Sequence, residues 1–165
     1  MTSVAQDSHL PALAHHAREE AGRELQATLV ELVDLSLLGK QLHWNISGRP
    51  FKAVHEHLDE LVESWRNLAD TVAERAATLG FAPDGQAVTV SAARGRTAVE
   101  RGPLNTDTAL GELVWRIANV AERIRARMDR LGELDLVSQD VLIEVVRELE
   151  KQLWMVRSSL PTETA

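Results

Sequence analysis

The chain has 165 residues, with 25 acidic side chains and 18 Lys or Arg, so its formal net charge is 18 − 25 = −7 and its length suits one ordinary domain. No apolar run approaches the roughly 18 residues that span a bilayer, and the first twenty residues lack the features of a secretory signal, so we expect a cytoplasmic protein without membrane contact. The absence of cysteine excludes disulfides, iron–sulfur clusters and thiolate chemistry, so any metal must bind to His, Asp or Glu.

Apolar residues at helical spacing predict a long first helix from about Ala14 to Ile46. Residues 47–50 (SGRP) then predict a sharp turn, because Gly tolerates a left-handed stop and Pro favours the start of a following helix. The helical period resumes from Phe51 to Leu79 and predicts a second long helix.

Residues 81–106 have a broken pattern and predict a long connection with one short helix near Val90 to Arg94. Thr106 or Asp107 is expected to cap a third helix over Thr108 to Leu131. The arginines of this helix fall off its apolar stripe, so we expect its outer side to be basic.

A fourth helix is predicted from Ser138 to about Ser159, and no segment shows the alternation of a strand. Four long helices with one tight turn and one long connection indicate an all-α four-helix bundle with a long crossover. Without repeats or linkers, we expect one domain over residues 1–165 with its core at about 14–160. Core or interface positions are expected for the tryptophans, which are Trp44, Trp65, Trp115 and Trp154.

Five side chains have a spacing that suits a metal site: His43, His55, Asp59, Asp70 and Glu74. On the second helix, the last four point within about 100° of one another. His55 and Asp70 are nevertheless fifteen residues apart, about 22 Å along the axis, so one copy of the chain cannot close a site with all of them. Two antiparallel copies related by a two-fold axis would bring the histidine end of one helix onto the carboxylate end of the other. Such a mixed site suits a divalent first-row metal such as iron.

The same residues leave plainer interpretations open. Asp70 with Arg66, or Glu74 with Arg75, could form ordinary ion pairs on the helix surface. The segment HEHLD at 55–59 begins like a zinc-protease helix but ends in Asp59, and no Glu-x-x-His pair supports a di-iron site within one chain. The remaining histidines are expected to be solvent-exposed, and these are His9, His15, His16 and His57.

The motifs are characteristic in combination: LHWNISG at 42–48, F-x-x-V-H-x-x-x-D at 51–59, D-x-x-A-E-R at 70–75 and LG at 79–80. The segment at 138–160 adds a lysine-glutamine-x-tryptophan stretch. Over about residues 20–160 the chain resembles the Dps family, the DNA-binding proteins from starved cells, also called mini-ferritins. The resemblance implies a ferritin-like bundle that assembles as a hollow homododecamer.

The resemblance also implies a ferroxidase centre, with two irons in each site between two subunits. Its implied ligands are His43, His55 and Asp59 from one subunit and Asp70 and Glu74 from its partner. By this likeness Asp70, Glu74 and His43 bind the tighter iron, whereas His55 and Asp59 hold a second iron or a bridging water. Trp44 would lie beside the metals and take up an oxidising equivalent.

The implied reaction oxidises Fe(II) to Fe(III), preferably with hydrogen peroxide, stores the ferric mineral in the shell and so protects DNA from oxidative damage. The alternatives are a DNA-condensing shell on the nucleoid, in which the iron site is secondary, and a structural bundle. Residues 1–17 contain no Lys or Arg, and twelve copies carry 12 × −7 = −84 charges, so we expect weak or no DNA binding. Candidates for the acidic pores through which iron enters such shells are Glu122, Asp129, Glu133 and Asp135.

Overall fold

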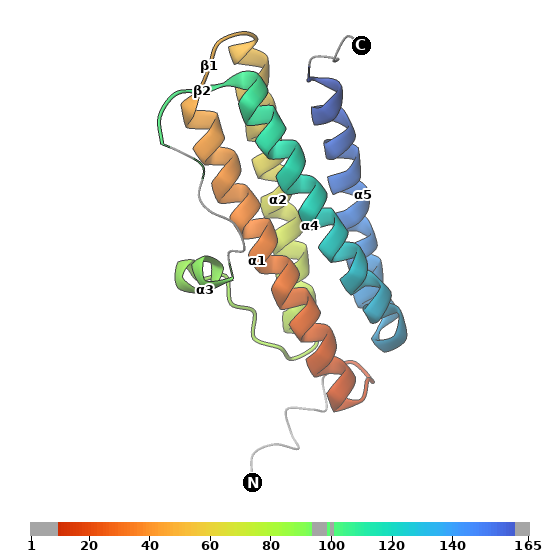
Figure 1. Cartoon of the computed structure of the whole chain (residues 1–165). Coiled ribbons are helices and arrows are strands. Elements are labelled where there is room, and N and C mark those ends of the chain that lie inside the picture. Colours follow the sequence, from red (N-terminus) through yellow and green to blue (C-terminus); the bar gives the residue numbers. More distant parts are fainter. Residues whose placement is uncertain (1–9, 94–98, 100, 161–165) are drawn as a thin grey trace.

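The computed structural model describes residues 10–93, 99 and 101–160 and contains four long helices that lie side by side (Figure 1). These are α1 (His15–Asn45), α2 (Phe51–Thr78), α4 (Thr106–Leu134) and α5 (Leu136–Ser158). The short helix α3 (Ala87–Ala92) interrupts the long connection and packs against α1. The predicted four-helix bundle with one crossover is therefore confirmed.

The core of the bundle is built from leucine, isoleucine and valine side chains on the inward faces of all four long helices, with Trp65 fully buried among them. The largest fully buried aliphatic side chains are Leu25, Leu32, Leu35, Leu38, Leu42, Leu58, Leu61, Leu79, Leu113, Ile117 and Ile124. Trp65 is the tryptophan that meets the core expectation, whereas Trp44, Trp115 and Trp154 are exposed on the single chain. Within the described part of the chain, no helix combines the length and the apolarity needed to cross a bilayer.

Gly39 marks a close approach of α1 to α2. A Cβ atom on Gly39 would lie 2.5 Å from Cγ2 of Val62 and 2.9 Å from Cζ3 of Trp65. The absence of a side chain at Gly39 therefore lets the two helices pack closely, one helical turn before His43.

The expectation of no strand was wrong, because two very short strands form a parallel pair. Strand β1 (Ile46–Ser47) follows α1, and strand β2 (Leu104–Asn105) precedes α4, with Ile46 opposite Leu104 and Ser47 opposite Asn105. Two residues are too few to show the period-two alternation by which strands are detected in a sequence. The pair joins the α1–α2 turn to the end of the long connection.

Two predicted boundaries in the connection were misplaced. Helix α3 begins at Ala87 rather than near Val90, and Arg94 lies outside the described residues. The cap of α4 is Asn105, whose side chain accepts a hydrogen bond of 2.8 Å from the backbone N–H of Asp107. The predicted cap at Thr106 or Asp107 was therefore wrong by one or two residues, and Asn is as good an N-cap as either.

The start of α5 also differs from the prediction, since the helix begins at Leu136 and not at Ser138. Its N-cap is Asp135, which accepts hydrogen bonds from the backbone N–H groups of Val137 (3.3 Å) and Ser138 (3.1 Å). A carboxylate at this position satisfies free N–H groups and also interacts favourably with the helix dipole.

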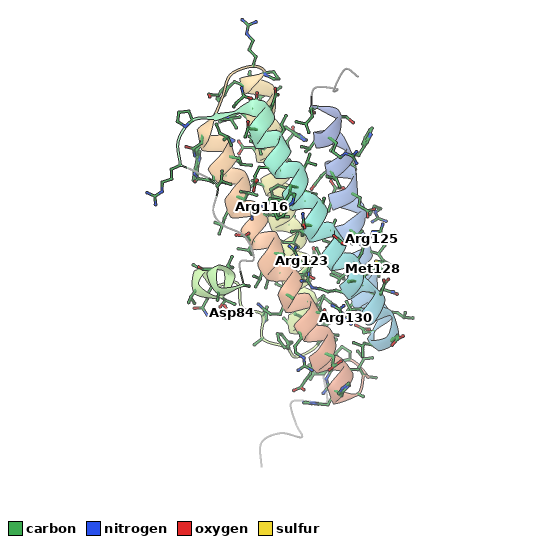
Figure 2. All side chains as sticks on the ribbon, viewed as in Figure 1. Asp84, Arg116, Arg123, Arg125, Met128 and Arg130 are labelled. Carbon is green, nitrogen blue, oxygen red and sulfur yellow. The ribbon has the colours of Figure 1, made fainter. Side chains whose placement is uncertain are left out.

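The expectation that the arginines of α4 lie on a basic outer side was wrong for two of them. Arg116 and Arg127 are buried, and Arg127 Nη1 donates a hydrogen bond of 2.5 Å to Glu31 on α1. The more exposed arginines of α4, which are labelled in Figure 2, are also ion-paired. These pairs are Arg123 with Glu31, Arg125 with Glu150 and Arg130 with Glu24.

Candidate metal centre

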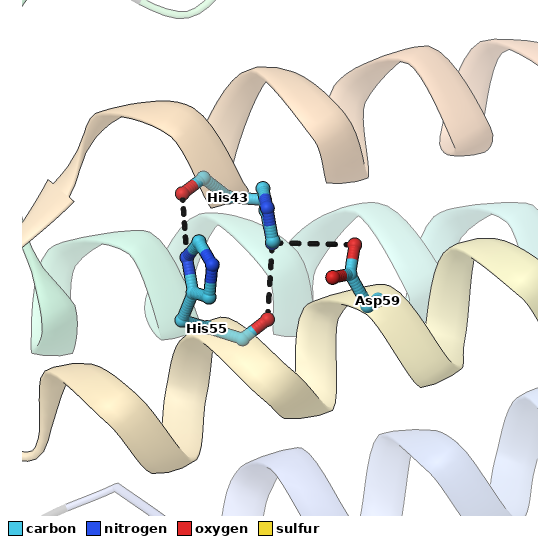
Figure 3. A group of neighbouring side chains, drawn as sticks. All are labelled: His43, His55 and Asp59. Carbon is cyan, nitrogen blue, oxygen red and sulfur yellow. Dashed lines mark hydrogen bonds and ion pairs between the residues drawn. The ribbon is translucent and has the colours of Figure 1, made fainter.

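The turn between α1 and α2 brings the first part of the candidate site together. Gly48 has a φ of +98°, a left-handed conformation that glycine adopts without strain, and it lets the chain reverse within residues 46–50. The C-terminal end of α1 therefore lies beside the N-terminal end of α2. His43 on the last turn of α1 faces His55 on the second turn of α2 (Figure 3).

The two histidines hold each other in place through reciprocal hydrogen bonds. His43 Nδ1 lies 3.0 Å from the carbonyl oxygen of His55, and His55 Nδ1 lies 3.2 Å from the carbonyl oxygen of His43. Their rings are stacked with centroids 3.6 Å apart, and Phe51 stacks on the other side of His55 at 5.0 Å. Because a carbonyl oxygen only accepts, each Nδ1 carries the hydrogen in the neutral ring. Each Nε2 then keeps a free lone pair, the form in which imidazole binds a metal.

Asp59 completes a three-residue group with these histidines (Figure 3). One potential ligand atom from each of His43, His55 and Asp59 lies within 4.8 Å of the other two. Asp59 lies one turn after His55 on α2, and its Oδ1 is 3.3 Å from His43 Nδ1. His43 is buried, His55 is half-buried and Asp59 is exposed, so the group opens to the surface of the bundle.

Asp59 is also bound by Lys40, a residue that the sequence analysis missed. Lys40 Nζ donates a hydrogen bond of 2.6 Å to Asp59 Oδ1. This hydrogen bond is the main influence that holds the pKa of Asp59 below its ordinary value of 3.8, and the positive charge of Lys40 acts in the same direction. Asp59 is therefore an ionised, acceptor-only carboxylate at neutral pH. Lys40 precedes His43 by three residues, and this spacing on one helix face was the available signal.

The two remaining candidate residues, Asp70 and Glu74, lie further along α2 on its C-terminal half. Both side chains are exposed. Among the residues that the structure describes, no cationic group lies within 4 Å of either carboxylate. Arg75 pairs with Asp135 at 2.6 Å rather than with Glu74, and Arg66 does not pair with Asp70, so the interpretation as local ion pairs was wrong. One chain thus joins three of the five candidates and leaves two carboxylates exposed.

Trp44 follows His43 directly and is 68% exposed, with Lys40 Nζ 5.8 Å from the centroid of its ring. Trp44 is therefore close to the candidate ligands in sequence and free to contact a second molecule.

Two other histidines are solvent-exposed as expected. His15 and His16 at the start of α1 each lie one turn from a glutamate, at 3.8 Å from Glu19 and 3.6 Å from Glu20. His9 lies outside the described residues. The side chain of His57 is only 25% exposed and lies 3.4 Å from Glu60, so the expectation that His57 is solvent-exposed was wrong.

The proposed pore carboxylates divide into two groups. Glu122, Asp129 and Glu133 are exposed on α4, as a pore lining requires. Asp135 is 7% exposed and bonds to Arg75, so its assignment to a pore was wrong.

Comparison with known proteins gives one consistent family. The ferritin-like domain family matches residues 22–163. The chain is 40% identical over 155 residues to the DNA protection during starvation protein of Mycolicibacterium smegmatis. The aligned residues cover 92% of this chain and 82% of that protein.

Solved structures agree with this result. The tetragonal form of Mycobacterium smegmatis Dps is similar with a TM-score of 0.90 and 37% identity, over 99% of this chain and 96% of that one. Dps from Microbacterium arborescens in its high iron form is similar with a TM-score of 0.85 and 34% identity, over 90% of this chain and 97% of that one. Fold, motifs and relatives agree, and the chain belongs to the Dps family of ferritin-like proteins.

Proposed function

We propose that this protein is a ferroxidase, which oxidises Fe(II) at sites completed between two subunits and stores the ferric product inside a dodecameric shell. One observation carries the proposal. Two imidazoles and an ionised carboxylate converge at one end of α2, while two exposed carboxylates on its C-terminal half form no ion pair with any residue that the structure describes. Membership in a family of iron-storage and DNA-protection proteins supports the same function.

The completed site requires a second copy of α2. His55 and Asp70 are fifteen residues apart on this helix, about 22 Å along its axis, too far for ligands of one metal. An antiparallel α2 from a partner subunit would bring Asp70 and Glu74 to the group formed by His43, His55 and Asp59. A two-fold axis makes two such sites in each dimer, because each subunit offers both halves.

The side chains in this arrangement suit the oxidation of iron. Neutral imidazole binds Fe(II), and hard carboxylate oxygens stabilise the Fe(III) product relative to the Fe(II) substrate. Asp70, Glu74 and His43 would bind the tighter iron, and His55 and Asp59 a second iron or a bridging water. Trp44 lies beside this group and can supply or accept one electron.

Hydrogen peroxide is the electron acceptor that we propose. Two Fe(II) and two protons reduce one peroxide to two waters and yield two Fe(III), so both electrons leave together and no hydroxyl radical is released. Removal of Fe(II) and peroxide would protect DNA chemically, in the cytoplasm and without contact. Iron would enter through acidic pores, for which the exposed Glu122, Asp129 and Glu133 are the candidates.

Direct DNA binding is expected to be weak. DNA affinity depends on free Lys and Arg that neutralise phosphates. The exposed arginines of α4 are ion-paired to glutamates of α1 and α5, and a phosphate would have to displace these carboxylates. With twelve copies at −7 each, the long-range field also repels DNA.

The proposal is tested by loading the assembled protein with Fe(II) without oxygen, adding hydrogen peroxide, and following ferric absorbance and residual peroxide. We expect fast oxidation with about two Fe(II) consumed per peroxide. Asp70→Asn removes one ligand charge and should lower the initial rate by about tenfold or more while the particle size is retained. Asp140→Asn, at an exposed position on α5, is the matched control and should oxidise Fe(II) like the unmodified protein. Oxidation no faster than in buffer, or an unchanged rate in Asp70→Asn, would contradict the proposal.

A further inference from the structure

Asp135 has two roles in the turn between α4 and α5. Its side chain caps α5 through the backbone N–H groups of Val137 and Ser138, and it accepts a short hydrogen bond from the Ser138 hydroxyl. Burial, the strongest single influence, acts to raise the pKa of Asp135, but hydrogen bonds from Ser138 and Arg75 outweigh it. The pKa of this carboxyl therefore lies below its ordinary value, and Asp135 is a buried anion at neutral pH.

The countercharge comes from α2. Arg75 Nη2 donates a hydrogen bond of 2.6 Å to Asp135, and Arg75 Nε donates one of 3.0 Å to the Ser138 hydroxyl. The Arg75 side chain is 13% exposed and that of Asp135 is 6% exposed. A planar guanidinium bound at two points fixes direction as well as distance, so this contact holds one residue of α2 in a defined orientation against the α4–α5 turn.

The position of Arg75 on α2 links this contact to the two candidate metal ligands on the same half of the helix. Arg75 directly follows Glu74 and lies five residues after Asp70. Successive residues on a helix are about 100° apart, so an Arg75 directed to the α4–α5 turn leaves Glu74 on the outer side. The orientation of Arg75 therefore sets the rotation and the axial position of the last turns of α2, and with them the directions of both exposed carboxylates.

Other contacts hold different parts of the same helix. The histidine stack fixes the N-terminal end of α2 to α1. The indole of Trp65 donates a hydrogen bond of 2.8 Å to Gln152 on α5 and fixes the middle of α2. The ion pair of Arg75 with Asp135 fixes the C-terminal half of α2, which carries Asp70 and Glu74.

We propose that the buried pair of Arg75 and Asp135 positions the C-terminal end of α2, so that Asp70 and Glu74 meet the histidine group of the partner subunit in the geometry that Fe(II) requires. This inference rests on the proposed ferroxidase function. Both residues are positioning residues and contact no iron themselves.

The test uses the double variant Arg75→Met/Asp135→Asn in the assembled protein. Asn still caps α5, and Met fills much of the volume of Arg75. One positive and one negative charge are removed together, so the net charge is unchanged and no lone charge is left buried. The matched control is Arg127→Met/Glu31→Gln, which removes a largely buried pair between α4 and α1. The second partner of Glu31, Arg123, is half exposed and stays solvated in this control.

The measurements are particle size by light scattering, the Fe(II) concentration at half-maximal rate, and the rate at saturating Fe(II) with peroxide. We expect the Arg75 double variant to need about tenfold more Fe(II) for half-maximal rate, as for residues that orient metal ligands. Its rate at saturating Fe(II) should stay within about twofold of that of the unmodified protein, because the proposed iron ligands themselves are unchanged. The control should keep both values within about twofold of the unmodified protein.

The inference is wrong if the Fe(II) concentration at half-maximal rate of the Arg75 double variant stays within twofold of that of the unmodified protein. It is also wrong if this concentration rises as much in the control variant. Should the double variant not assemble, Arg75→Lys takes its place. Lys keeps the charge but not the two-point contact, so a rise of about threefold is expected and no rise would refute the positioning role. Asp70→Asn separates the two hypotheses: if it loses oxidation while the Arg75 variants behave normally, the ferroxidase proposal stands and only this inference fails.

Discussion

Gly39→Ala is a sharp test of the helix packing that supports the candidate metal centre. The new Cβ would lie 2.5 Å from Val62 and 2.9 Å from Trp65, both buried side chains of α2. Overpacking of this kind costs about 1–3 kcal/mol. Replacing Gly by Ala inside a helix stabilises it by about 1 kcal/mol, so the expected net loss is about 1 kcal/mol.

Gly111→Ala is the matched control for this variant. Gly111 lies inside α4, and a Cβ atom there would have no heavy atom within 4 Å apart from its own helix backbone and chain neighbours. The control therefore gains the helix propensity of about 1 kcal/mol without a clash. Because the propensity gain is common to both variants, the difference of about 1–3 kcal/mol between them isolates the packing of α1 against α2.

The assay is urea unfolding at one fixed subunit concentration, because the stability of an oligomer depends on concentration. Since His43 lies one turn after Gly39, pushing α1 away from α2 should also separate His43 from His55 and raise the Fe(II) concentration at half-maximal oxidation. Equal stabilisation by Gly39→Ala and Gly111→Ala would show that the helices do not approach as closely as described.

Two further predictions concern acid stability and DNA. Because the pKa of Asp135 lies below 3.8, its stabilising contribution is complete above that value and is lost as the pH falls through the folded-state pKa. The free energy of unfolding should therefore drop more between about pH 5 and pH 2.5 in the unmodified protein than in Asp135→Asn, and equal drops would contradict this. The assembled protein should not retard duplex DNA at about 150 mM salt, whereas Glu24→Gln/Glu150→Gln frees two exposed arginines of α4 and should strengthen binding. Retardation by the unmodified protein would refute the first expectation, and no gain in the variant would refute the second.

The bundle could be predicted from the sequence because each long helix repeats apolar residues over many turns, and this signal is strong. The features that were missed are short or depend on distant residues. Strands of two residues show no alternation, and α3 is a single short helix in a connection without a clear period.

Asp135 shows why a candidate pore residue could be misassigned. In the sequence it stands among other acidic residues and resembles an exposed carboxylate at a helix end. Its partner Arg75 is sixty residues away, and no local pattern links the two. Part of the metal centre, in contrast, was accessible from spacing alone, since His55 and Asp59 are one turn apart on a helix that follows a tight turn after His43.

The central claim, that each site is built from two subunits, is tested most directly by mixing two inactive variants. His43→Ala/His55→Ala removes the histidine half, and Asp70→Asn/Glu74→Gln removes the carboxylate half. In a dimer of one subunit of each kind, one site has both halves damaged and the other has both halves intact. Random co-assembly of equal amounts makes about half of the dimers mixed and should restore about a quarter of the Fe(II) oxidation of the unmodified protein. Shells that contain both variants but oxidise no more Fe(II) than the average of the two inactive shells would contradict a site shared between subunits.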